Sequence, residues 1–251
     1  MQVKDSVVLI TGANRGIGKG FAEEFMKAGA KRIYLGVRKP ESVAELVKTA
    51  PDVFVPLALD VTDQQQIAKA AATAKDVTLL VNNAGVLEGG GLLDADRMEK
   101  ARHEMEVNYF GPMMMARAFA PVIVKNGGGA MVNVSSIAGL VAFPGIPTYC
   151  TSKAALYVLT QEERMEFKAM DIHVMSVHPG PVDTDMTRDF DMQKVSPAHI
   201  AQETIRALAS GEEMLLPDPY AKEIYDAFRR DPAVAARKVS ESFGPVVADA
   251  A

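Results

Sequence analysis

The chain alternates short apolar runs with segments of helical periodicity, and this alternation constrains the fold more than any other feature. Most of the runs are apolar at nearly every position. Strands of that kind are buried on both faces, which is typical of a parallel sheet. The expected strands are Ser6–Thr11, Arg32–Val37, Val53–Leu59, Val77–Val81, Ala130–Ser135, Ile172–Val177 and Met214–Leu216.

Helical patterns fill the connections between these strands. They cover Gly16–Gly29, Glu41–Thr49, Asp63–Ala74, Ala95–Asn126 with a break, Thr148–Ala169 and Pro197–Ser210. Alternating strands and helices favour right-handed crossovers. We therefore expect an α/β fold of three layers, in which a doubly wound, mostly parallel sheet of seven strands carries helices on both faces.

Length and composition fit one globular domain over residues 1–251. The net charge of −5 gives no sign of a clustered basic face, so no nucleic acid is expected as a partner. The single cysteine excludes an internal disulfide and is compatible with a reducing compartment. We find neither a secretory signal nor an apolar run of ~18 residues, so we expect a cytoplasmic protein without membrane contact. The tail from about Tyr220 has a helical pattern that frays, and its role is open.

Three glycines follow the first expected strand, in the segment Thr11-Gly12-Ala13-Asn14-Arg15-Gly16-Ile17-Gly18. The first permits a tight turn, the second lets the backbone approach a pyrophosphate, and the third lets the next helix pack close to the sheet. Free N–H groups and the positive dipole end of that helix favour phosphate. The segment predicts a dinucleotide-binding loop, with a glycine turn that holds no ligand as the alternative.

Polar residues also stand at the ends of the third and fourth expected strands. Asp60 closes the third, where it could meet an adenine amino group, and Asn82-Asn83-Ala84-Gly85 follows the fourth. Open α/β sheets bind ligands at the carboxyl ends of their strands. For Asp60, an N-cap of the next helix is the alternative interpretation, although Thr62 or Asp63 could serve there.

Tyr149 and Lys153 are four residues apart, and Ser136 lies thirteen residues before the tyrosine. On a helix, positions four apart share a face. A phenol normally ionises near pH ~10. A nearby ammonium group lowers that pKa, so Tyr149 could exchange a proton near neutral pH. The pair alone arises by chance, but beside the glycine loop it indicates proton transfer next to a nucleotide cofactor.

Through these motifs the chain resembles the short-chain dehydrogenase/reductase family from about Ser6 to Leu216. Asn108, Ser136, Tyr149 and Lys153 match its catalytic positions, and the segment from Pro179 to Thr184 resembles the one that holds the nicotinamide carboxamide. The resemblance implies a Rossmann fold with strand order 3-2-1-4-5-6-7. It also implies a cofactor site of Gly12, Asn14, Arg15, Gly16, Ile17, Gly18, Arg38, Asp60, Val61, Asn83, Ala84, Gly85, Tyr149, Lys153, Pro179, Gly180, Val182 and Thr184.

The end of the second expected strand bears on the choice of dinucleotide. A carboxylate there would bind the ribose diol of NAD, but none occurs before Glu41. Arg38 and, in the glycine loop, Arg15 instead place two cations near that ribose, and guanidinium suits a 2′-phosphate. We therefore expect NADP(H) in preference to NAD(H). Either arginine alone could equally be a solvated surface charge.

The resemblance implies reversible hydride transfer between the nicotinamide and a ketone, aldehyde or alcohol. Tyr149 is the expected general acid in reduction and base in the reverse direction. Lys153 would lower the pKa of Tyr149 and bind the nicotinamide ribose. Ser136 would donate to the substrate oxygen, with Ser135 as its competitor, and Asn108 would hold a water that links Lys153 to solvent. No metal is expected, since the four histidines lack ligand spacing. The alternative is a non-catalytic dinucleotide-sensing or signalling protein on the same fold.

Apolar residues in loops beside these groups are candidates for a substrate pocket that would suit a hydrophobic carbonyl compound. They are Leu87, Leu140, Val141, Phe143, Ile146, Met186, Phe190 and Met192. Arg188 and nearby aspartates could select a polar substrate instead. The helices over Asn108–Val124 and Thr148–Ala169 have more apolar positions than one sheet-facing stripe needs. In the family such helices often pair subunits, so we expect a homodimer or homotetramer.

Overall fold

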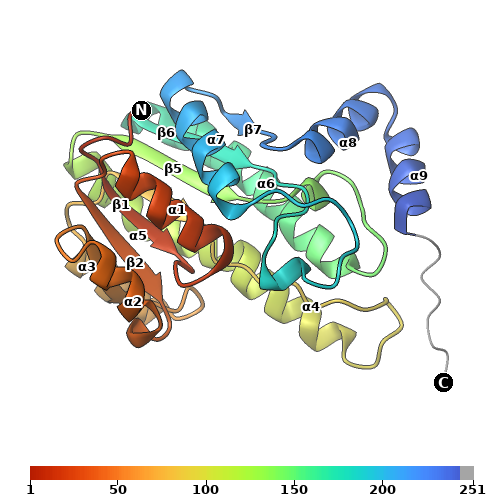
Figure 1. The fold of residues 1–251 in the computed structure, drawn as a ribbon, viewed down its shortest axis with the longest axis horizontal. Helices are drawn as coiled ribbons and strands as arrows, with labels where there is room; N and C mark the ends of the chain where they lie inside the picture. Colours follow the sequence, from red (N-terminus) through yellow and green to blue (C-terminus); the bar gives the residue numbers. More distant parts are fainter. Residues whose placement is uncertain (244–251) are drawn as a thin grey trace.

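The computed structural model describes residues 1–243. Its strands form one sheet in the order β3-β2-β1-β4-β5-β6-β7 (Figure 1). All six strand pairings are parallel, so the predicted order is confirmed and the sheet is parallel throughout. The strands are β1 (Val7–Thr11), β2 (Arg32–Val37), β3 (Phe54–Ala58), β4 (Leu79–Asn82), β5 (Gly129–Val134), β6 (Ile172–Val177) and β7 (Met214–Leu215).

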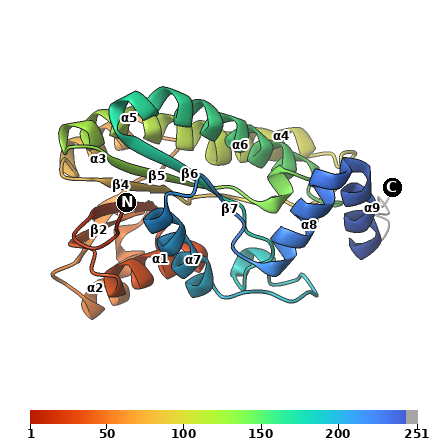
Figure 2. The same cartoon turned by 90° about the horizontal axis from the view of Figure 1, so that it is seen from above.

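Helices cover both faces of the sheet and make three layers (Figure 2). One face carries α1 (Gly16–Lys27), α2 (Ala44–Thr49) and α7 (Pro197–Ser210). The other carries α3 (Gln64–Thr73), α5 (Gly111–Lys125) and α6 (Pro147–Phe167). The expected segment Glu41–Thr49 begins as a 3-10 turn, η1 (Pro40–Val43), because Pro40 favours a tight helical start.

The apolar sequence of β1 is explained by burial on both faces. Val8 and Ile10 pack in the cluster beneath α1 and α7, whereas Val7 and Leu9 pack in the cluster beneath α3 and α5. Successive side chains of a strand point to opposite faces, so each of these four residues of the central strand enters one core or the other. The sheet thereby fixes where the carboxyl ends of β1, β2 and β4 meet.

The predicted break within Ala95–Asn126 is a π-helical turn. Helix α4 (Arg97–Met105) passes through η2 (Glu106–Phe110) into α5. Such turns interrupt an α-helix without ending it and are frequent at functional sites. Asn108 lies within the π-turn and is fully buried.

Beyond β7 the chain forms α8 (Pro219–Arg230) and α9 (Pro232–Phe243), which project at one end of the sheet (Figure 1, Figure 2). The carboxylate of Asp218 caps α8 by accepting a hydrogen bond from the N–H of Ala221 at 2.8 Å. Apolar residues of both helices share a buried cluster with Val141, Phe143 and Tyr149. The predicted helical tail is therefore packed against the segment before α6. The expected fraying at its end lies outside the described residues.

Across residues 1–243, none of the helices combines the length and the apolar character that a bilayer span requires.

Candidate active site

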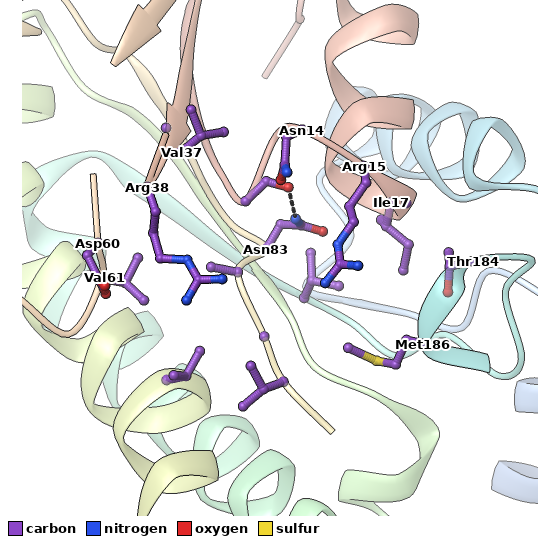
Figure 3. Close-up of a pocket in the computed structure, with 18 of the residues that line it drawn as sticks. Asn14, Arg15, Ile17, Val37, Arg38, Asp60, Val61, Asn83, Thr184 and Met186 are labelled. Carbon is purple, nitrogen blue, oxygen red and sulfur yellow. Dashed lines mark hydrogen bonds between the residues drawn. The ribbon is translucent and has the colours of Figure 1, made fainter. Parts of the chain in front are cut away.

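A cavity of about 770 Å³ lies at the carboxyl ends of β1, β2 and β4 and reaches the first turn of α6 (Figure 3). Of the predicted cofactor residues, those that line it are Gly12, Asn14, Arg15, Gly16, Ile17, Arg38, Asp60, Val61, Asn83, Ala84, Gly85, Tyr149, Lys153 and Thr184. Four others, Gly18, Pro179, Gly180 and Val182, are not in its lining. One surface thus joins the glycine loop to the tyrosine and the lysine.

The sequence did not single out several other lining residues. These are Gly36, Val37, Lys39, Ser42, Leu59, Val86, His103, Val107, Val134 and Asp185. Most are strand-end or helical residues of ordinary type, so they give no local signal of a site. The order of strands in the sheet could have indicated Val37, Leu59 and Val134, because each stands at the carboxyl end of a strand. Ser135, which was expected as the competitor of Ser136, also lines the cavity, whereas Ser136 and Asn108 are not in its lining.

The glycine loop is shaped for close approach of a ligand. Gly12 and Gly16 have φ values of 67° and 51°, in the left-handed region that favours glycine. A Cβ on Gly18 would lie 2.2 Å from the carbonyl oxygen of Gly12, so no side chain fits there. Arg15 is the N-cap of α1 but makes no capping hydrogen bond, and the first turn of α1 has no acidic residue. The N–H groups at this helix start are available to an anion.

Asn83 holds the glycine loop against the end of β4. Its side-chain amide donates to the carbonyl oxygens of Thr11 at 2.9 Å and Gly12 at 3.3 Å. In return the Thr11 hydroxyl accepts from the backbone N–H groups of Asn83 at 2.9 Å and Ala84 at 3.0 Å. These four bonds fix the turn from β1 into α1 relative to the neighbouring strand.

Two guanidinium groups extend toward the same side of the cavity. Arg38 comes from the end of β2 and Arg15 from the start of α1 (Figure 3). Arg15 also pairs with Asp185 across the cavity, with Nη1 3.3 Å from Oδ2. Lys39 and Ser42 also line the cavity. This concentration of donors and positive charge suits a phosphate group.

Asp60 lines the cavity and does not cap the following helix. Its carboxylate accepts from the N–H and the hydroxyl of Thr62 at 2.9 Å and 2.8 Å. The N-cap of α3 is Asp63, whose side chain accepts from Gln65 and Gln66. The capping alternative for Asp60 was therefore wrong, because Asp63 fills that position.

Tyr149 and Lys153 lie on successive turns of α6, as their spacing predicts. Both are buried, at 7% and 4% exposure. The Lys153 ammonium is 5.8 Å from the centre of the Tyr149 ring and donates to the carbonyl oxygen of Val134 at 2.9 Å. Lysine and tyrosine thus face one cavity, with the ammonium over the ring and held against the end of β5.

Burial raises the pKa of Tyr149 well above its ordinary value, and a hydrogen bond with Ser136 acts in the opposite direction. Lys153 is not among the groups that shift the pKa of Tyr149 here, so the expected lowering by its ammonium group is not seen. Burial lowers the pKa of Lys153 to about 8. In this arrangement the phenol carries its proton at neutral pH.

The structure separates the two candidate serines. The Ser135 hydroxyl donates to the carbonyl oxygen of Lys153 at 3.1 Å, which fixes it inside the protein. The Ser136 hydroxyl caps a short 3-10 turn, η3 (Ile137–Gly139), by accepting from Ala138 at 3.1 Å, and it also bonds Tyr149. Ser136 is therefore the serine that touches the phenol.

Asn108 joins α4–α5 to α6 and to the end of β4. Its amide donates to the carbonyl oxygen of Val86 and to the Ser152 hydroxyl, both at 2.9 Å, and accepts from the N–H of Val86 at 2.9 Å. A Cβ on Gly85 would lie 3.2 Å from Asn108 Oδ1 and 3.4 Å from Lys153 Nζ. Asn108 and Lys153 thus approach the same glycine from two helices.

The segment from Pro179 to Thr184 lies between the cavity and α8. The side chain of Thr184 faces Gly16, where a Cβ would be 3.2 Å from Thr184 Cγ2. The N–H of Gly180 donates to Asp218 at 2.7 Å. The sequence did not indicate Asp218, since a carboxylate before a helix gives only a capping signal.

The candidate substrate residues fall into two places. Met186 lines the cavity and is 42% exposed. Val141 and Phe143 are buried in the cluster with α8 and α9, and Leu87, Leu140 and Ile146 pack against that cluster. Phe190 and Met192 lie in the loop before α7, and Phe190 is half-buried. Among residues 1–243, no cluster of His, Cys, Asp and Glu has the composition of a metal site.

The cavity fits a nicotinamide dinucleotide. It combines an uncapped helix start, glycines that leave no room for a Cβ, two guanidinium groups and a buried phenol. With the doubly wound sheet, this arrangement defines a Rossmann-fold oxidoreductase. The family described as short chain dehydrogenase matches residues 6–194. The chain belongs to the short-chain dehydrogenase/reductase family.

Similar proteins agree with this assignment. A short chain dehydrogenase from Burkholderia cenocepacia J2315, solved in complex with NADP, is 38% identical with a TM-score of 0.89; the match covers 95% of this chain and 99% of that one. An NADP-dependent 3-hydroxy acid dehydrogenase from Schizosaccharomyces pombe is 31% identical over 84% of this chain and 90% of its own length. The short chain dehydrogenase pigC of Monascus ruber is 36% identical over 71% of this chain, and the match spans 63% of that protein. Together they indicate a nicotinamide cofactor.

Proposed function

We propose that the protein is an NADP(H)-dependent carbonyl reductase that also works in reverse as an alcohol dehydrogenase. The observation that supports this proposal is the placement of Tyr149 and Lys153 in the same cavity as the glycine loop. Pure cofactor binding would need the loop alone. A buried phenol that is hydrogen-bonded to Ser136 adds a proton donor beside it.

A bound nicotinamide supplies or accepts the hydride, and the residues of the chain handle the charge and the proton. In reduction, negative charge develops on the carbonyl oxygen. Ser136 donates a hydrogen bond to that oxygen, and Tyr149 gives it a proton. The raised pKa of Tyr149 suits this role, because the acid must hold its proton until the oxygen becomes basic.

Lys153 and Asn108 support Tyr149 in this scheme. Lys153 binds the nicotinamide ribose and stabilises the phenolate that remains after proton transfer. Asn108 helps to hold a water that returns a proton through Lys153. Three of the four hydrogen-bonding positions of the Asn108 amide already have protein partners, so the contact with that water falls to the remaining lone pair of Oδ1.

NADP(H) is the proposed cofactor because two cations border the cavity and no carboxylate stands at the end of β2. Arg38 is the stronger candidate for the 2′-phosphate. Arg15 would first exchange its partner Asp185 for the phosphate. The similar structure solved with NADP and the NADP-dependent relative support the same choice.

The proposed substrate is a small ketone, aldehyde or alcohol of largely apolar character. Met186 is the one candidate pocket residue that borders the cavity within the described chain. We also propose that the protein forms a homodimer or homotetramer. Val124 on α5 and Val158 and Met165 on α6 are exposed apolar side chains at 43%, 57% and 66%, which pairing of these helices would cover.

The test is a panel of aldehydes, ketones and alcohols assayed by the absorbance of reduced nicotinamide. We expect turnover with NADPH that exceeds turnover with NADH. The Tyr149→Phe variant serves as the control for catalysis by this site. Tight binding of NADPH without turnover of any compound would contradict the proposal and favour a dinucleotide sensor.

A further inference from the structure

A buried polar cluster lies beside the first turn of α6, and the roles proposed above do not use it. Glu104 on α4 is fully buried, and Arg97 at the start of α4 is 3% exposed. Buried charges are costly unless hydrogen bonds or opposite charges compensate them. The partners of Glu104 and Arg97 therefore show what this cluster holds in place.

The Thr148 hydroxyl connects the two charged groups. It donates to Glu104 Oε2 at 2.5 Å and accepts from Arg97 Nη1 at 3.1 Å. The other carboxylate oxygen of Glu104 accepts from the N–H of Glu88 at 2.8 Å. Thr148 immediately precedes Tyr149, so these hydrogen bonds hold the chain one residue before the tyrosine.

Arg97 also holds the loop between β4 and α4. Its guanidinium donates to the carbonyl oxygens of Glu88 at 2.9 Å, Gly89 at 2.7 Å and Gly91 at 2.9 Å. Gly90 has a φ of 117°, and a Cβ there would lie 2.5 Å from Arg97 Nη2. One arginine thus occupies the inside of this loop.

The same loop meets the segment that leads into α6. The N–H of Gly90 donates to the carbonyl oxygen of Gly145 at 2.8 Å. Helix α4, the loop after β4 and the start of α6 are therefore joined by hydrogen bonds around Thr148. This junction is separate from the Asn108 contacts, which reach Ser152 one turn further along α6.

We propose that Glu104, Thr148 and Arg97 form a positioning cluster that sets the place of Tyr149 relative to the substrate oxygen. The inference rests on the proposed function, because it assigns these residues to the step in which Tyr149 transfers a proton. Glu104 and Arg97 act through Thr148 and touch no reacting atom. Their effect reaches the phenol through the backbone of α6 and through charge.

The charge of Glu104 allows a measurement that distinguishes a positioning role from a purely structural one. Burial is the main reason that the pKa of Tyr149 is raised, and the charge of Glu104 raises it further. The other titratable or charged groups near Tyr149 or on the cavity wall include Arg97, His178, Cys150, Lys153, His103, Arg15, Arg38, Lys39, Asp60 and Asp185. A variant that neutralises only Glu104 leaves all of these in place.

The principal variant is Glu104→Gln. The amide has nearly the same size, and its oxygen can accept from the N–H of Glu88 while its nitrogen donates to the Thr148 hydroxyl, so the link to Thr148 persists with its direction reversed. Loss of the negative charge makes the phenol easier to ionise. We expect the rise of the alcohol-oxidation rate with pH to occur at lower pH, with an apparent ionisation constant at least about twofold larger than that of the wild type. The affinity for NADPH, measured by fluorescence, should be unchanged.

Glu163→Gln is the matched control. Glu163 is also a buried carboxylate and lies on α6, but it bonds Asn133 and is not among the groups that act on Tyr149. Its replacement should leave the rise of the alcohol-oxidation rate at the wild-type pH. If Glu104→Gln behaves like this control and its rate also rises at the wild-type pH, the positioning cluster is refuted.

A second pair of variants gives a test that does not depend on Glu104→Gln folding. Thr148→Val keeps the side-chain shape and removes the hydroxyl, and Thr148→Ser restores it. We expect a roughly tenfold loss of kcat in the first, unchanged NADPH affinity in both, and recovery in the second. Equal kcat for the valine and serine variants would overturn the proposal. Absence of turnover in the wild type itself would instead show that the proposed function fails.

Discussion

The buried carboxylate of Asp218 accepts a hydrogen bond from the backbone N–H of Gly180 at 2.7 Å. The other oxygen of Asp218 caps α8 through Ala221. One side chain therefore fastens the C-terminal helices to the segment that resembles the nicotinamide-binding one. There is also no room for a side chain at Gly180, where a Cβ would lie 2.7 Å from Asp218 Oδ1.

We predict that Asp218→Asn weakens both the fold and cofactor binding. An amide keeps one acceptor oxygen, so one of the two backbone N–H groups loses its partner inside the protein. A buried unsatisfied donor costs about 1–3 kcal/mol. Urea denaturation should show that loss, and NADPH titration should show lower affinity. Asp226→Asn, on the exposed side of α8, should match the wild type in both measurements.

Tyr149→Phe should abolish turnover while NADPH binding stays close to that of the wild type. The change removes only the hydroxyl that bonds Ser136, and the ring stays in its buried cluster. Steady-state rates and fluorescence titration measure the two properties separately. A variant that retained a substantial part of the wild-type rate would show that another group supplies the proton.

Arg38→Asp should shift cofactor preference toward NADH. The substitution replaces a guanidinium at the end of β2 with a carboxylate, which repels a 2′-phosphate and can bind a ribose diol. We expect the ratio of kcat/KM for NADPH over NADH to fall at least ~tenfold, or ~1.4 kcal/mol. Lys31→Asp makes the same change of charge just before β2, at an exposed position, and should leave that ratio unaltered.

Gly18→Ala should impair the cofactor loop although it adds only one methyl group. The new Cβ would lie 2.2 Å from the Gly12 oxygen and 2.5 Å from Asn83 Nδ2, and the first of these is backbone that cannot move aside. We expect weaker NADPH binding and a lower melting temperature. Gly89→Ala is the control, because its Cβ would have its nearest neighbour at 3.8 Å. Equal behaviour of the two variants would contradict the close packing of α1 on the loop.

Glu163 should make the stability of the protein depend on pH. Burial raises its pKa to about 7 from the model-peptide value of 4.5, so the folded state binds a proton that the unfolded state has released between those values. Stability attributable to this group is present below pH ~4.5 and is lost as pH rises through ~7. The full effect is at most ~3 kcal/mol.

Glu163→Gln should remove that dependence. We expect the variant to gain stability relative to the wild type between pH 5 and pH 8, measured by urea denaturation at each pH. A constant difference in unfolding free energy across this range would show that the carboxyl does not titrate there. Glu162→Gln, on an exposed part of α6, is a suitable control, because Glu162 is not among the groups that shift the pKa of Glu163.

Patterns of neighbouring residues predicted the strands and helices whose formation depends on the neighbouring residues themselves. Arg32–Val37, Ile172–Val177 and Pro197–Ser210 occur with the expected bounds. The fourth strand begins two residues later than expected, at Leu79, because the Thr78 hydroxyl accepts from the N–H of Val7 at the strand start. Tyr149 and Lys153 face one cavity as their spacing predicted, since both lie on one regular helix.

What the sequence did not indicate depends on contacts between distant residues. The bond between Thr148 and Glu104 spans 44 residues, and that between Gly180 and Asp218 spans 38. Neither pair has a spacing that a helix or strand would produce. The burial of the Tyr149 phenol could not be predicted from neighbouring residues in the sequence either. The burial that raises its pKa comes partly from α8 and α9.

The π-turn around Asn108 sets how α5 is rotated about the helix axis relative to α4. Each residue of an α-helix advances the side-chain direction by about 100°. The wide turn takes up one extra residue without such a rotation, so deleting a single residue between Glu106 and Phe110 would restore a regular helix and remove the bulge on which Asn108 lies. Trimming this turn would therefore move Asn108 away from its partners Val86 and Ser152 even though both flanking helices could keep their places.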